Sequence, residues 1–136
     1  MPAQVPFLAH AALQLAVVLG LRRDLAAAVF AQTLLFVAAN KVCTAQYFAW
    51  WLPFAVLVAG PLSTDAKARR RVARAAVDWA VALALWLAVA FRLEFHGDAV
   101  HTVLWGLTVL FFAANVRVLL AVLDADDRRR RPAPDS

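Results

Sequence analysis

Apolar residues occur in five long blocks along this chain, with short polar connections between them. The blocks are rich in Leu, Ala, Val and Phe, and their polar positions do not alternate with apolar ones as they would in a half-buried strand. A helix needs roughly 17–25 residues to cross a bilayer. We therefore predict an all-α fold, a polytopic helical membrane protein of about five transmembrane helices. The predicted spans are 5–21, 25–39, 47–62, 72–91 and 101–123.

Composition supports this class. Of the 136 residues, 64% are hydrophobic and 17% are charged, whereas a soluble domain carries about a quarter charged residues. The mean hydropathy is +0.70. The first block lacks the basic n-region of a signal peptide, and His10 and Gln14 interrupt it. We expect it to remain as a membrane helix.

Basic residues mark one side of the predicted bundle. Five spans place the first, third and last polar segments on the same side, and these hold eleven of the 14 basic residues: Arg22, Arg23, Lys67, Arg69, Arg70, Arg71, Arg74 and 128–131. Only Lys41 and Arg92 lie in the other connections, and this bias predicts a cytoplasmic C-terminus. The net charge of +5 therefore reflects membrane topology, and we expect no nucleic-acid partner. We divide the chain into a bundle, 1–123, and a disordered basic tail, 124–136.

Two ionisable residues fall inside predicted spans. Asp78 lies one turn into the fourth span, and Arg117 lies about two turns from the end of the fifth. Because antiparallel neighbours bring these positions to similar depth, we predict an ion pair between them. A proton or ion pathway is the alternative, and pairing or snorkelling is favoured.

A polar cluster joins the second and third blocks, running from Asn40 to Trp51. Polar groups at a membrane edge are costly, which favours a ligand-binding role. Lys41 carries a compact charge suited to a phosphate. Sugar hydroxyls are read by amide and hydroxyl groups such as those of Asn40, Thr44, Gln46 and Tyr47. Trp50 and Trp51 can stack on a sugar or anchor the helix at the lipid interface.

The 92–100 connection contains Glu94, His96 and Asp98. His96 with Asp98 could hold a metal, although a solvated loop is the stronger interpretation and we predict no metal site. Glu94 is a weak catalytic candidate because it lies between Leu93 and Phe95. The single cysteine, Cys43, forms no internal disulfide and is interpreted as a small packing residue.

The run from Phe30 to Trp50, with Asn40-Lys41-Val42-Cys43-Thr44-x-Gln46-Tyr47-Phe48 at its centre, resembles the C-terminal region of the GPI mannosyltransferase I family. The stretch Leu93-Glu94-Phe95-x-Gly97 is similar to that family at the expected distance. The likeness covers residues 5–123. It implies a multi-span glycosyltransferase of the GT-C type, located in the endoplasmic reticulum membrane.

The resemblance implies a reaction as well. Members of this family transfer the first α-1,4-linked mannose from dolichyl-phosphate mannose to glucosaminyl-(acyl)phosphatidylinositol on the lumenal face, with inversion. Expected partners are therefore the lipid-linked donor, the glycolipid acceptor, membrane lipids and a small stabilising subunit. Carried over by position, the residues implied to contact substrate are Asn40, Lys41, Thr44, Gln46, Tyr47 and Trp50.

One departure concerns the acidic Asp-x-Asp motif of the family's first lumenal loop. The only such match here, Asp124-Ala125-Asp126, falls in the predicted cytoplasmic tail. Inverting transfer needs a carboxylate to accept the acceptor proton, so the catalytic residue stays unassigned. We expect a C-terminal part of a longer enzyme that is inactive alone. The alternative is a non-enzymatic accessory subunit or a small transporter-like bundle.

Overall fold

The computed structural model describes residues 4–39, 48–59 and 66–130. These residues form helices and short connections, without a strand among them. In chain order the elements are α1 (Gln4–Leu21), α2 (Leu25–Ala38), α3 (Phe48–Ala59), α4 (Ala66–Phe91), a π-helical turn (Arg92–His96) and α5 (His101–Arg130). The predicted all-helical fold is confirmed, and each apolar block contains one helix.

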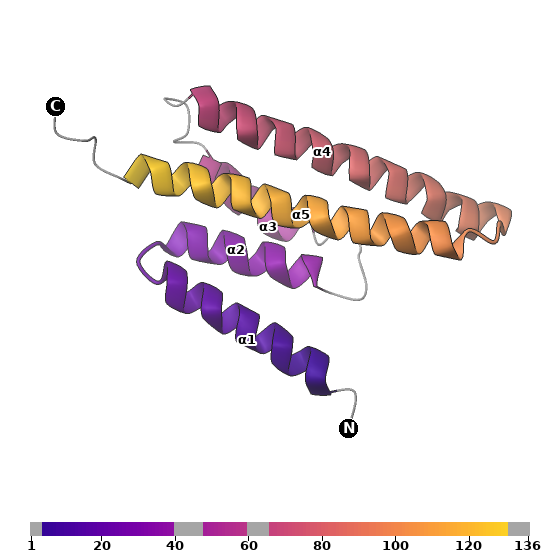
Figure 1. Cartoon of the computed structure of the whole chain (residues 1–136), viewed down its shortest axis with the longest axis horizontal. Coiled ribbons are helices and arrows are strands. Elements are labelled where there is room, and N and C mark those ends of the chain that lie inside the picture. The colour runs from indigo at the N-terminus through magenta and orange to yellow at the C-terminus, as the bar shows by residue number, and fades with distance from the viewer. Residues whose placement is uncertain (1–3, 40–47, 60–65, 131–136) are drawn as a thin grey trace.

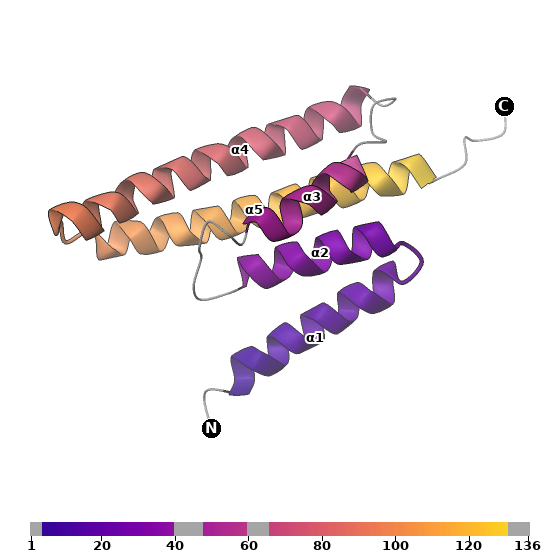
Figure 2. The same cartoon turned by 180° about the vertical axis from the view of Figure 1, so that it is seen from behind.

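The helices pack as two hairpins with α3 beside them. Figures 1 and 2 show α1 antiparallel to α2, and α4 running alongside α5 over most of its length. Helix α2 is central, because it contacts α1, α3 and α5. The core joins α2, α3 and α5, and α4 contributes one buried residue, Ala75. The buried core residues are Phe30, Ala31, Leu34, Leu35, Val37, Trp51, Val58, Ala75, Val118, Leu119 and Val122.

Helix α2 has clear local reasons to form. Asp24 caps its N-terminus, where Oδ1 accepts a hydrogen bond from the backbone N–H of Ala27 at 3.2 Å. A side chain at this position satisfies a donor that the first turn leaves without a partner. Within the helix, Thr33 Oγ1 donates back to the carbonyl of Val29 at 2.8 Å. The hydroxyl therefore needs no other partner inside the bundle.

Helix α5 differs from prediction at its end. We predicted disorder from Asp124, but the helix continues to Arg130, so that prediction is wrong for residues 124–130. Asp124 Oδ2 accepts hydrogen bonds from Arg71 Nη1 at 2.9 Å and from Arg128 Nε at 3.0 Å. One bond ties the last turns to α4 and the other lies along α5 at i,i+4 spacing, which favours helix. Residues 131–136 lie outside the described ranges.

Charged residues gather at one end of the bundle. The α1–α2 connection, the beginning of α4 and the end of α5 lie there together, and we call this the basic end (Figure 1). The beginning of α1, the end of α2 and the α4–α5 connection lie toward the other end. This is the arrangement that the distribution of basic residues predicts. Which end faces the cytoplasm stays a prediction.

Among the residues that the structure describes, two segments, Ala66–His96 and His101–Arg128, are long and apolar enough to cross a membrane. Shorter apolar helices cover Leu8–Leu21 and Leu25–Ala38. Large apolar side chains lie exposed along the outer faces, including Leu19, Val56, Leu87, Trp105 and Leu120. Lipid rather than water suits such faces, because a continuous apolar surface of this extent is unfavourable in a soluble monomer.

Candidate functional site

Most of the predicted substrate-binding cluster lies outside the described residues. This applies to Asn40, Lys41, Thr44, Gln46 and Tyr47. Trp50 is described, and so are the parts of α1 and α2 that approach it. The structure therefore describes Trp50 of the predicted site together with the helices that contact it.

Three aromatic rings from three helices form a rim. Trp50, in the first turn of α3, is 44% exposed, and its ring centroid lies 6.3 Å from that of Phe36 on α2. Phe36 in turn contacts His10 of α1 edge-on, with centroids 5.7 Å apart. We call His10, Phe36 and Trp50 the aromatic rim. An exposed indole held by neighbouring rings can present a flat apolar face to a sugar or a lipid.

A polar contact lies beside the rim between α1 and α2. Gln14 Nε2 donates a hydrogen bond to the backbone carbonyl of Gln32 at 3.3 Å and lies 3.5 Å from His10 Nε2. The two polar residues that interrupt the first apolar block thus lie together, one turn apart. In the sequence they stand out only as polar interruptions of the block. Their i,i+4 spacing was the signal that they share a helix face.

Trp51 has a different environment from Trp50. It is 2% exposed and packs edge-on against Phe30 and Trp79, at centroid distances of 6.3 and 5.4 Å. Its indole Nε1 is buried and has no hydrogen-bond partner among the described residues. Of the two adjacent tryptophans, Trp50 is the one accessible to a ligand, and Trp51 belongs to the core.

A buried polar pair continues the core into α4 and α5. Trp79 Nε1 donates to Oδ1 of Asn115 at 3.0 Å, and Asn115 Nδ2 donates to the carbonyl of Phe111 at 2.8 Å. Asn115 is 1% exposed. This residue was not among those predicted from the sequence. An amide within an otherwise apolar span, two positions before Arg117, was the available signal.

Glu94 lies in the π-helical turn that ends α4, and its side chain is exposed. The rings of Phe91 and Phe95 stack on each other, with their centroids 4.5 Å apart. Gly97 ends the turn with a φ of 70°. Asp98 forms an ion pair with Arg92, in which Oδ2 lies 2.8 Å from Nη2. Across the described part of the chain, His, Cys, Asp and Glu side chains form no group of three that could hold a metal.

The predicted ion pair within the α4–α5 hairpin is confirmed. Arg117 Nη1 lies 2.7 Å from Asp78 Oδ2. A groove of about 370 Å³ surrounds the pair, lined by Val81 and Ala82 of α4 and by Leu110, Ala113 and Ala114 of α5. The two charges therefore lie at a surface depression and remain partly exposed.

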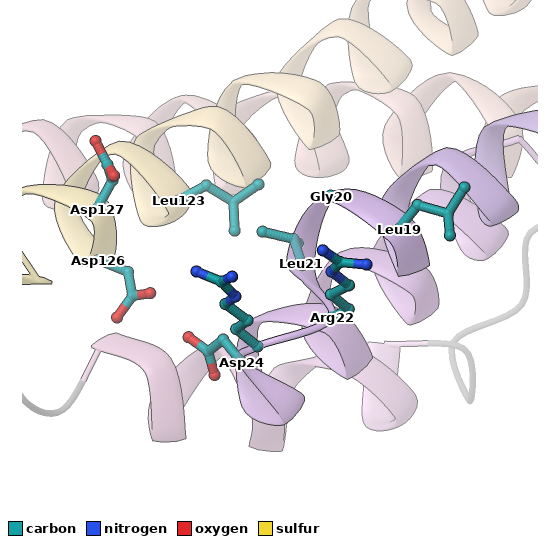
Figure 3. A pocket seen from close by; sticks show the side chains of 9 residues that line it. Leu19, Gly20, Leu21, Arg22, Asp24, Leu123, Asp126 and Asp127 are labelled. Atoms are coloured by element: carbon teal, nitrogen blue, oxygen red, sulfur yellow. The ribbon is translucent and has the colours of Figure 1, made fainter.

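A second cavity, of about 590 Å³, lies at the basic end between the α1–α2 connection and α5. Figure 3 shows Arg22 and Asp24 on the connection and Asp126 and Asp127 extending from α5. Asp126 is 5% exposed. Charges of both signs line this cavity, so its electrostatics favours holding the connection near α5. The Asp124-Ala125-Asp126 match therefore lies at the basic end, away from the aromatic rim.

The helical architecture and the exposed apolar faces define a helical membrane protein. The chain belongs to the mannosyltransferase (PIG-M) family, whose model matches residues 3–123. This confirms the family that the sequence motifs predict.

Curated relatives agree with this family. GPI mannosyltransferase 1 of Trypanosoma brucei brucei is 39% identical over 115 residues, which cover 76% of this chain and 26% of the relative. The Aspergillus fumigatus protein of the same name is 37% identical over 121 residues, covering 88% of this chain and 28% of the relative. In Danio rerio, the catalytic subunit of GPI alpha-1,4-mannosyltransferase I is 34% identical over 103 residues, 74% of this chain and 25% of the relative. The chain thus spans about a quarter of the length of these relatives. No solved structure matches it.

Proposed function

We propose that this chain contributes the substrate-binding region of a membrane mannosyltransferase in GPI-anchor biosynthesis. The reaction is transfer of the first α-1,4-linked mannose from dolichyl-phosphate mannose to glucosaminyl-(acyl)phosphatidylinositol, at the lumenal face of the endoplasmic reticulum. The observation that carries this proposal is the family match over residues 3–123. The names of the relatives support it, because they are GPI mannosyltransferases.

Within this proposal, the 40–47 segment and Trp50 contact the substrates. Lys41 would bind the phosphate of the donor, since an ammonium group is a compact charge. Asn40, Thr44, Gln46 and Tyr47 would hydrogen-bond to sugar hydroxyls. Trp50 would stack on a sugar ring. Its exposure and its support by Phe36 favour this role for Trp50 over Trp51.

The proposed reaction also needs acid–base chemistry. An inverting transfer requires a carboxylate that accepts the proton of the attacking hydroxyl. Glu94 is an exposed carboxylate on the α4–α5 connection, away from the basic end, which keeps it as a weak candidate. Asp124 is a poorer candidate, because Arg71 and Arg128 bind its carboxylate at the basic end.

The proposal includes a topology. The five helices would each cross the membrane, with the basic end in the cytoplasm and the aromatic rim toward the lumen. The clustering of the α1–α2 connection, the start of α4 and the end of α5 supports this orientation (Figure 1). Membrane lipids and a small stabilising subunit would cover the exposed apolar faces.

A chimera tests the function. Residues 3–123 replace the matching segment of the Danio rerio relative, and the chimera is expressed in cells lacking that activity. We expect it to restore surface GPI-anchored proteins, measured by flow cytometry. The Gln46→Ala chimera should restore much less, whereas Lys67→Ala, a change at the opposite basic end, should behave as the unsubstituted chimera.

Folding must be separated from function in this test. The amount of each chimera in the membrane is measured by immunoblotting, and restoration is compared at equal amounts. An unsubstituted chimera that is present at normal levels but restores nothing would contradict the proposed function. Full restoration by Gln46→Ala would contradict the site assignment alone.

A further inference from the structure

The groove on the α4–α5 hairpin has a polar end and an apolar end. Helix α4 begins at the basic end and α5 ends there, so Asp78 and Arg117 lie nearer that end than Ala82 and Leu110. Arg74 lies one helical turn before Asp78, on the same side of α4. Charge therefore lies at the outer end of the groove, and apolar residues continue from it toward the middle of the membrane.

The inner part of the groove is shaped by small side chains. Ala82, Ala113 and Ala114 line it, and Val81 and Leu110 flank them. Because an alanine side chain ends at Cβ, the backbones leave space that longer residues would fill. Little of the apolar part of α4 is covered by the rest of the chain, because most of its side chains are exposed or half-buried. A hydrocarbon chain can therefore reach this part of the groove from the side.

Arg117 is suited to a phosphate at the outer end. Its side chain is 61% exposed, and the contact with Asp78 occupies one Nη atom and one carboxylate oxygen. A guanidinium group carries five N–H donors in a planar fork that matches phosphate oxygens, so donors remain for a further acceptor. Arg70, Arg71 and Arg74 of the neighbouring helix α4 add positive charge near the membrane surface, and such charge attracts anionic lipids.

We propose that this groove binds an anionic phospholipid, with its phosphate at Arg117 and one acyl chain along Ala82, Ala113 and Ala114. The order of groups along the groove matches the order in a lipid, with charge at the membrane surface and hydrocarbon inside. A membrane helix from another protein is the competing occupant, since small residues also favour helix packing. It is disfavoured because such a helix would have to cover Arg74 and the ion pair, whereas a lipid phosphate balances the net positive charge that Arg74, Asp78 and Arg117 carry together.

Lipid affinity of the whole chain in detergent micelles tests this site. Phosphatidylglycerol and phosphatidylcholine with identical acyl chains are titrated, and bound lipids are counted by native mass spectrometry. We expect one phosphatidylglycerol to bind at least about fivefold more tightly than phosphatidylcholine, as about 1 kcal/mol per surface cation gives. Arg117→Gln should remove most of this preference. Asp78→Asn should increase it, because it removes a repulsive carboxylate.

A filled groove provides the second variant. Ala113 is exposed, so Ala113→Phe should occupy the groove without disturbing the core, and it should abolish the tight phosphatidylglycerol site. Ala84→Phe is the matched control, because Ala84 is exposed on α4 and does not line the groove. It should bind lipid as the unsubstituted chain does. Circular dichroism confirms that each variant keeps its helical content.

Three results would overturn the proposal. The first is equal affinity of the unsubstituted chain for the two lipids. The second is an unchanged phosphatidylglycerol preference in Ala113→Phe, which would mean that the basic residues alone attract the lipid. The third is a change in oligomeric mass in Ala113→Phe with lipid binding unaltered, which would assign the groove to a second helix.

Discussion

Trp79 Nε1 donates a hydrogen bond to Oδ1 of Asn115 at 3.0 Å, which joins α4 to α5 inside the bundle. The Asn115 amide also donates to Phe111, and the ring of Trp79 contacts Trp51 edge-on. The α4–α5 hairpin is therefore connected to α3 through an indole whose polar atom is satisfied.

Loss of this contact should destabilise the hairpin. We expect Asn115→Leu to lower the free energy of unfolding by about 1–2 kcal/mol, because it leaves the Trp79 indole without its acceptor. Trp105→Phe, on the exposed face, is the control and should have little effect. Unfolding is followed in mixed micelles with a denaturing detergent. A stability of Asn115→Leu equal to that of the parent would show that the bond contributes nothing.

The Asp78–Arg117 pair should show coupling. Arg117→Leu leaves a carboxylate at membrane depth without its cation, so it should destabilise the protein more than the double change to leucine at both positions. The coupling energy from the double-mutant cycle should be roughly 0.5–3 kcal/mol. If the double variant is as unstable as Arg117→Leu, the two charges do not stabilise each other.

Substitutions of Trp50 and Trp51 should have different effects, one on function and the other on stability. Trp51→Ala empties a core position and should cost about 3–5 kcal/mol. Trp50→Ala should leave stability nearly unchanged and should weaken substrate binding, seen as a higher KM in the chimera. Thermal unfolding and mannosyl transfer are measured on both. Equal losses of stability would contradict the different environments of the two rings.

Glycosylation mapping tests the topology. An Asn-x-Thr acceptor placed in the 97–100 connection should be glycosylated in cells if that connection is lumenal. The same acceptor placed after residue 131 should stay unmodified, because the basic end is expected in the cytoplasm. Removal of the glycan by an endoglycosidase, read as a mobility shift, checks each result. The opposite pattern would invert the proposed orientation.

Much of the fold could be predicted from the apolar blocks, because each block is long enough for a helix and too apolar for a soluble surface. The Asp78–Arg117 pair could be predicted as well, since antiparallel helices joined by a short connection bring equivalent depths together. The family could be predicted because the run from Phe30 to Trp50 resembles the motif of that family, and the family model that matches residues 3–123 confirms it.

Other features depend on helix rotation, which apolar patterns alone do not determine. Trp50 and Trp51 are chemically identical neighbours, and only packing against Phe30 and Trp79 makes one of them core. The extension of α5 depends on Arg71 of α4, which lies far away in sequence. The amide of Asn115 stands out within an apolar span, but the sequence does not show that it faces Trp79 inside the bundle.

The most direct test of the central claim is transfer of labelled mannose from dolichyl-phosphate mannose by membranes that contain the chimera. Lys41→Ala should reduce this transfer sharply, because it removes the charge proposed to bind the donor phosphate. Lys67→Ala is the matched control at the basic end and should leave transfer unchanged. Equal transfer by the Lys41→Ala chimera and the unsubstituted chimera, at equal protein amounts, would contradict the account.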